Sequence, residues 1–204
     1  GCWFLIRDLG MKPRAAFLGA AVFSFSGFFV SLGSLLNLLD SAAFMPLTLC
    51  FAGRAASRGF APWGSLAAAS LAVQFLAGEP AMLLMTLAAL GALHFSHAAT
   101  VGSPAAKERP ATAKAVSLVM ILLLGGALSL AGLLPAMELL AASERGAGFD
   151  PGASLEWSLH PMALLQSVAS GVLGDPTWID AGHWWGGRWF DNGLPLVLSL
   201  YLGP

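Results

Sequence analysis

The sequence predicts an all-α, polytopic transmembrane helical bundle, and three observations favour this fold class. Hydrophobic residues make up 57% of the chain and charged residues only 10%, whereas soluble domains carry about 25% charged residues. The mean hydropathy is +0.75. The hydrophobic residues also gather in runs of about 20 residues, the length of helix that crosses about 30 Å of hydrocarbon. The net charge of −1 leaves no basic surface typical of a nucleic-acid-binding protein.

We expect about five complete spans, with partial spans at both ends of the chain. Asp40 and Ser41 are common N-caps, so one of these helices should begin there and be kinked at Pro46. Because the chain begins with Gly1 and its last apolar run, from Leu194, stops unfinished, we interpret it as an internal fragment of a larger protein. The expected spans are residues 1–6 (partial), 15–32, 41–55, 63–77, 80–97, 115–134 and 194–204 (partial).

The distribution of Lys and Arg predicts the orientation of these spans. Cytoplasmic loops are enriched in basic residues, and most basic residues fall in three loops on one face. Glu79 and the polar segment 135–193 then lie on the extracytoplasmic side, and the expected organisation is a bundle (1–134), an outer loop (135–193) and a further span (194–204). The basic residues that define the cytoplasmic face are Arg7, Lys12, Arg14, Arg54, Arg58, Lys107, Arg109 and Lys114.

The outer segment combines an apolar helix pattern with tryptophans. Residues 161–173 predict an amphipathic helix that lies along the bilayer interface. Trp185 belongs to a tryptophan-rich stretch (Trp178, Trp184, Trp185 and Trp189). Such residues form membrane-interface belts or flat platforms for sugar rings and polyprenyl tails, and both interpretations stay open.

Glu79 is the central candidate for chemistry. It stands between Gly78 and Pro80, where two apolar runs meet. A carboxylate in hydrocarbon is costly, so Glu79 should face an interface or a wet cavity. Asp40 and Glu138 are expected at the same outer depth, and three carboxylates could act as base, acid or metal ligands. The structural alternatives are an N-cap for Asp40, a helix-start residue for Glu79 and an interface residue for Glu138.

Arg145 is the basic residue in the first part of the outer segment. It could pair with the phosphate of a donor substrate, or form an ion pair with Glu144. His94 and His97 have the i, i+3 spacing of metal ligands but no third ligand in view. We therefore assign no metal site, and the cofactors, a divalent metal among them, are left open.

The order of several motifs resembles the YfhO family of bacterial multispanning membrane proteins. These motifs are FSFSGFF (23–29), NLLDSAAFMPL (37–47), QFLAGEP (74–80), GLLPAMELL (132–140) and NGLPL (192–196), with the helix expected at Pro161.

That family is similar to GT-C glycosyltransferases, which are helical bundles of the bacterial cytoplasmic membrane with an active site on the outer face. The resemblance implies transfer of a sugar from a polyprenyl-phosphate donor to a cell-envelope glycan acceptor. The family's principal catalytic acid usually lies in the first outer loop, which would precede Gly1. The candidate catalytic residues are Glu79, Glu138 and Asp40, and the candidate substrate-binding residues are Asn37, Gln74, Arg145, Trp185 and Asp191.

Two other functions remain open at this point. A transporter or lipid flippase would be favoured by broken helices near a midplane site and by internal repeats, and no repeat is evident between the halves of the chain. A non-catalytic membrane assembly protein is the third function left open.

Overall fold

The computed structural model is all-helical wherever it describes regular structure. It describes residues 1–95, 109–143, 148, 160–169, 171–175, 183–190, 193 and 199–201, and no strand occurs among them. The chain divides into two compact units. Unit 1 comprises Gly1–Ala21 and Leu35–Met137, and unit 2 comprises Val22–Ser34 and Glu138–Pro204.

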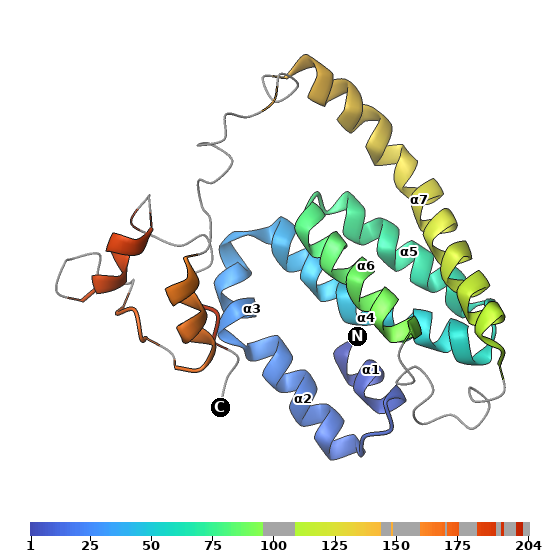
Figure 1. Cartoon of the computed structure of the whole chain (residues 1–204), viewed down its shortest axis with the longest axis horizontal. Coiled ribbons are helices and arrows are strands. Elements are labelled where there is room, and N and C mark those ends of the chain that lie inside the picture. The colour runs from blue at the N-terminus through green and yellow to red at the C-terminus, as the bar shows by residue number, and fades with distance from the viewer. Residues whose placement is uncertain are drawn as a thin grey trace. The chain divides into compact units, whose positions relative to one another are not determined.

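Figure 1 shows the helices in chain order. The helix α2 passes from unit 1 into unit 2 at Val22, and α7 does so at Glu138. The helices are α1 (Cys2–Asp8), α2 (Pro13–Phe25), α3 (Gly27–Ser31), α4 (Leu36–Arg58), α5 (Trp63–Leu76), α6 (Pro80–Phe95) and α7 (Ala111–Ala142), with the short 3-10 helices η1 (Leu32–Ser34), η5 (Pro161–Ser167) and η6 (Trp185–Trp189).

Three helical segments are long and apolar enough to cross a membrane. They are Pro13–Ser34, Leu36–Arg58 and Ala111–Ala142. The helices α5 and α6 are apolar but contain only 14 and 16 residues, fewer than the roughly 17 that a perpendicular span requires. The all-α class and the membrane character therefore have support in the structure, but the expected count of about five spans is not confirmed.

Two helix boundaries differ from those the sequence predicts. The helix α4 begins at Leu36, so Asp40 and Ser41 lie inside it and do not cap it. Leucine is a strong helix former, and the leucines before Asp40 extend the helix toward the N-terminus. The helix α7 continues through Pro135 to Ala142, so Glu138 is helical. Neighbouring groups can compensate for the lost hydrogen bond of a proline in an apolar helix.

The apolar run 15–32 is interrupted at Ser26, where an unbroken helix was expected. Ser26 has extended backbone angles (φ −61°, ψ 150°), and its hydroxyl accepts a hydrogen bond from Phe29 N at the start of α3. The amide of Gly27 donates to Tyr201 O at 2.8 Å within unit 2. The backbone N–H groups of Phe29 and Gly27 therefore remain hydrogen-bonded despite the break.

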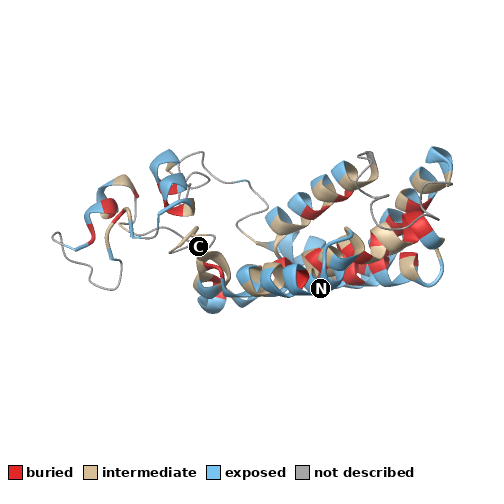
Figure 2. Cartoon of the chain, turned by 90° about the horizontal axis from the view of Figure 1, so that it is seen from below, coloured by how far each residue is buried: buried red, intermediate tan, exposed pale blue. Residues whose placement is uncertain are grey.

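The core of unit 1 is built on small residues. The helix α4 packs against α5 and α6 (Figure 1). Small side chains allow the backbones of apolar helices to approach closely. The fully buried cluster between these helices and α7 contains Ala52, Ala55, Ala67, Leu90 and Ile121. Figure 2 marks the buried residues of the chain in red.

Buried polar side chains tie the same three helices together. The amide nitrogen of Gln74 in α5 donates to Ser41 O in α4 and to Thr86 Oγ1 in α6, both at 2.8 Å. Thr48 Oγ1 and Ser70 Oγ share a second hydrogen bond of 2.8 Å between α4 and α5. Burying an unpaired polar group costs several kcal/mol, so these pairs favour one register of the helices.

Unit 2 has a small hydrophobic cluster of its own. It contains Ala163, Leu173, Trp184 and Phe190. The amphipathic helix expected over residues 161–173 is shorter than predicted: η5 ends at Ser167, and a turn around Gly171 follows. Gly171 has a φ of +71°, a conformation that stops a helix.

We predict that Gln74→Leu lowers the free energy of unfolding by about 1–2 kcal/mol, because Thr86 and the carbonyl of Ser41 lose their buried donor. Unfolding in mixed detergent micelles, followed by circular dichroism, measures this change. Val73→Leu is the matched control, since Val73 is the preceding residue of α5 and is 43% exposed. Equal stability of the two variants would contradict the structural role of Gln74.

Candidate functional site

The turn between α5 and α6 positions Glu79. Gly78 has a φ of +81°, and its amide donates to Phe75 O at 3.0 Å, which ends α5. Pro80 is the first residue of α6, a position where its fixed φ suits the helix and its missing N–H costs nothing. The predicted break at residues 78–80 is thus confirmed, and it places the Glu79 side chain at the helix ends.

Asn37 and Glu79 come together in this turn. The amide Nδ2 of Asn37, in the first turn of α4, donates to Oε2 of Glu79 at 3.2 Å. Asn37 is exposed and Glu79 is half-buried. An amide donor beside a carboxylate holds that carboxylate in one orientation, and it leaves Oε1 of Glu79 without a partner among the described residues.

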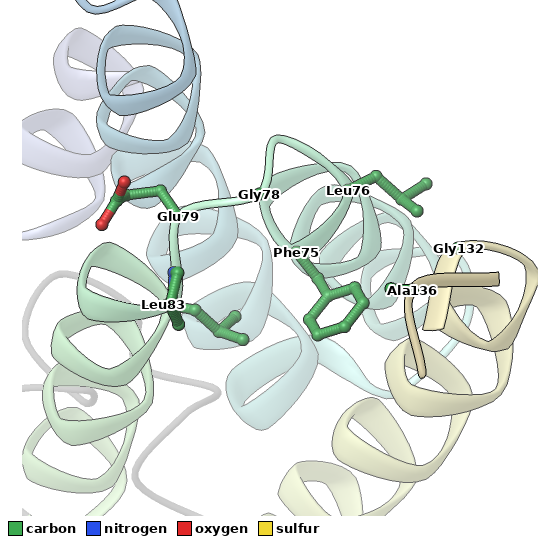
Figure 3. Close-up of a pocket in the computed structure, with 8 residues that line it drawn as sticks. Phe75, Leu76, Gly78, Glu79, Leu83, Gly132 and Ala136 are labelled. Atoms are coloured by element: carbon green, nitrogen blue, oxygen red, sulfur yellow. The ribbon is translucent and has the colours of Figure 1, made fainter. Parts of the chain in front are cut away.

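An apolar cavity of about 330 Å³ adjoins Glu79. Figure 3 shows Phe75 and Leu83 on one side, and Gly132 and Ala136 of α7 on the other. The carboxylate of Glu79 points away from these apolar side chains. The cavity is therefore suited to a hydrocarbon group, and the carboxylate to a polar group outside it. The residues that line it are Phe75, Leu76, Gly78, Glu79, Pro80, Leu83, Gly132 and Ala136.

The other two carboxylates of the predicted set, Asp40 and Glu138, are both exposed. Asp40 lies one turn after Asn37 in α4 and is exposed. Glu138 is exposed in α7 and belongs to unit 2. Within the described ranges, no three His, Cys, Asp or Glu side chains lie close enough to hold a metal ion.

The predicted substrate-binding residues are placed differently from one another. Gln74 is fully buried, and both hydrogen bonds of its amide nitrogen go to neighbouring helices. Trp185 is 41% exposed in unit 2. Arg145 and Asp191 fall outside the described residues, so their assignments stay predictions. Asn37 and Gln74 are the members of this set in the described part of unit 1, and Asn37 contacts Glu79.

A second polar cluster was missed by the sequence analysis. Arg54 donates from Nε to Asp8 Oδ2 at 2.6 Å and from Nη2 to Oδ1 at 3.3 Å, and Cys50 Sγ donates to Oδ2 at 3.3 Å. The guanidinium carbon lies 4.8 Å from the ring centre of Trp63 and 5.7 Å from that of Phe4.

This cluster joins α1 to α4 inside unit 1. Arg54 is expected in a polar loop from the sequence, but Arg54 and Asp8 both lie in helices. The one local signal is the i, i+4 spacing of Cys50 and Arg54, which puts them on one face of a helix. Nothing in the sequence indicates that Asp8 is the partner.

Comparisons with protein-family models, with curated proteins and with solved structures found no match for this chain. The resemblance to the YfhO family therefore remains a prediction from the quoted motifs.

We predict that Asp8→Asn exposes Cys50, because the charged pair that holds α1 against α4 is lost. A hydrogen bond to a charged group contributes enough free energy to the packing of α1 on α4 that its loss should raise the rate of Cys50 maleimide labelling about tenfold. The measurement uses a Cys2→Ser background and mass spectrometry of the labelled protein. Asp40→Asn, which removes an exposed carboxylate of α4, should leave the rate unchanged; an equal rise in both variants would argue against the pair.

We also predict opposite effects of alanine at two glycines with open space around them. No atom would lie within 4 Å of a Cβ at Gly78 or at Gly91. Gly78→Ala should cost about 1–2 kcal/mol because of its positive φ, whereas Gly91→Ala within α6 should stabilise the protein by up to about 1 kcal/mol. Thermal unfolding in detergent compares them, and a stabilising Gly78→Ala would contradict the geometry of the turn.

Proposed function

We propose that this protein is a membrane-embedded, glycosyltransferase-like enzyme. In this proposal it transfers a sugar from a polyprenyl-phosphate donor to a cell-envelope glycan on the extracytoplasmic side of the bacterial cytoplasmic membrane. The observation that supports it is the hydrogen-bonded pair of Asn37 and Glu79 at the edge of an apolar cavity. The motif resemblance adds the substrate class.

The cavity suits the lipid part of such a donor. Its walls come mainly from Phe75, Leu76, Leu83 and Ala136, and apolar walls of this kind accept isoprenoid chains by van der Waals packing. Cavities of about 300–1,000 Å³ commonly hold small ligands. We expect a few isoprene units to enter it, while the phosphate stays at the polar edge.

Glu79 would act on the acceptor. Its carboxylate is directed away from the apolar side chains, and Asn37 occupies Oε2. Oε1 can then accept the proton of an acceptor hydroxyl as that oxygen attacks the sugar carbon and the lipid phosphate leaves. A positioned general base of this kind contributes about 10²–10⁴-fold to the rate. The donor phosphate needs a cation, for which Arg145 is our candidate from the sequence.

A transporter or flippase is the second candidate, and one observation favours it. The candidate span Pro13–Ser34 is interrupted at Ser26 between α2 and α3. Discontinuous helices are common at the substrate sites of transporters. Vesicle flux of a lipid-linked sugar without chemical transfer would support this candidate over the enzyme.

The test measures sugar transfer from a radiolabelled polyprenyl-phosphate sugar in membranes that carry the protein. Glu79→Gln should reduce the transfer rate by about a hundredfold or more. Asn37→Ala should reduce it by about tenfold, since it removes one hydrogen bond to a charged group. Arg58→Gln, which removes an exposed charge at the last residue of α4, is the control and should transfer normally.

Two results would overturn the proposal. If Glu79→Gln retains full transfer at normal expression, Glu79 has no catalytic role. If the unsubstituted protein transfers no sugar from any polyprenyl-phosphate donor, the enzyme hypothesis itself is wrong.

A further inference from the structure

The short helix η6 of unit 2 holds an arginine against two indole rings. The guanidinium carbon of Arg188 lies 5.2 Å from the ring centre of Trp189 and 5.9 Å from that of Trp185. The two rings meet edge-on at 5.2 Å. Arg188 is exposed, and no carboxylate in the described part of the chain forms an ion pair with it. The two rings therefore fix the orientation of the guanidinium.

The polar atoms that this cluster offers are hydrogen-bond donors. Guanidinium carries five N–H groups and indole one, and neither has an acceptor. Trp184 Nε1 donates to Gly193 O at 2.6 Å, whereas the indole N–H groups of Trp185 and Trp189 have no acceptor among the described residues. A sugar would need acceptors as well as donors. A phosphate oxygen needs only donors and positive charge.

Exposed apolar side chains lie in the same unit. His160, directly before η5, stacks on Trp189 with a ring separation of 6.0 Å and an angle of 8°, so η5 begins beside the ring of Trp189. Ala163 and Gln166 are the buried residues of η5. The exposed apolar side chains of η5 are Met162 (39% exposed), Leu164 (57%) and Leu165 (46%). Val168, the residue after η5, is 82% exposed.

We propose that unit 2 binds the bilayer surface through an anionic phospholipid. Arg188, Trp185 and Trp189 hold the phosphate of its headgroup, and the exposed side chains of η5 enter the acyl region. An arginine held against aromatic rings, with exposed apolar side chains in the same unit, is typical of interfacial lipid-binding segments, and the guanidinium of Arg188 complements the phosphate of an anionic headgroup. This lipid site is separate from the sugar transfer proposed for Glu79 and does not depend on it.

The experiment places a fluorescent label at the most exposed of these apolar positions. Val168→Cys is labelled in a Cys2→Ser background, where Cys50 is only 1% exposed and stays unlabelled. The protein is reconstituted in nanodiscs of phosphatidylcholine alone, or of phosphatidylcholine with phosphatidylglycerol. Spin-labelled lipids then quench the label in proportion to its contact with the acyl region.

We expect quenching in both discs and more of it with phosphatidylglycerol. Arg188→Gln should lower the ratio of lipid-contacting to water-exposed label about fivefold in the anionic discs, the contribution of one basic residue at such a surface, and should leave the neutral discs almost unchanged. Arg58→Gln, in unit 1, is the matched control and should behave like the unsubstituted protein. Leu165→Glu should reduce quenching in both discs.

Several outcomes would overturn the proposal. An unquenched label in both discs means that η5 does not meet lipid and that another occupant, a protein or a glycan, covers it. Equal quenching with and without phosphatidylglycerol, unchanged in Arg188→Gln, means that no anionic headgroup is held. If inorganic phosphate abolishes the difference between the discs, the cluster binds free anions and not a lipid.

Discussion

The packing of unit 1 depends on finding partners for polar groups that are buried among apolar helices. The buried amide nitrogen of Gln74 finds acceptors in Ser41 O and Thr86 Oγ1, and the hydroxyls of Thr48 and Ser70 pair with each other. Small residues between α4 and α5 would otherwise permit several registers, because apolar contacts are not directional. The polar pairs select one, and that register brings Asn37 at the start of α4 to Glu79 after α5. Gln74 Oε1 and Ser41 Oγ remain unpaired among the described residues, so the network is only partly satisfied.

The ion pair of Asp8 and Arg54 changes how the basic residues bear on the orientation of the protein in the membrane. From the sequence, Arg54 is expected to be a free loop charge that helps to orient the protein. In the structure it lies within the candidate span α4, with a carboxylate partner and two aromatic rings. A neutralised pair contributes less to orientation than a free basic residue at a span end. The cytoplasmic assignment then depends more on Arg7, Lys12 and Arg14, which precede or begin α2 and are exposed.

Local chemistry could be predicted from the sequence, and long-range contacts could not. The turn at Gly78–Pro80 was predicted because glycine and proline act on their own backbone. The predicted N-cap at Asp40 and the predicted helix end before Pro135 were wrong. In each case the flanking leucines or the continued apolar sequence outweighed the local capping or proline signal. The bond between Asn37 and Glu79 spans 42 positions, and that between Asp8 and Arg54 spans 46. No periodicity relates such positions, so only the packed helices reveal them.

The interruption at Ser26 bears on the choice between enzyme and transporter. In transporters, the ends of a broken helix turn their free backbone groups toward the substrate. Here the hydroxyl of Ser26 accepts a hydrogen bond from the amide of Phe29, and the carbonyl of Tyr201 accepts one from the amide of Gly27. Ser31 Oγ donates to Gly27 O at 2.7 Å. These backbone groups are therefore hydrogen-bonded to other residues of the chain, so packing within unit 2 accounts for the break. The observation that favours transport is thereby weakened, and the polar pair beside the apolar cavity remains the stronger indication of function.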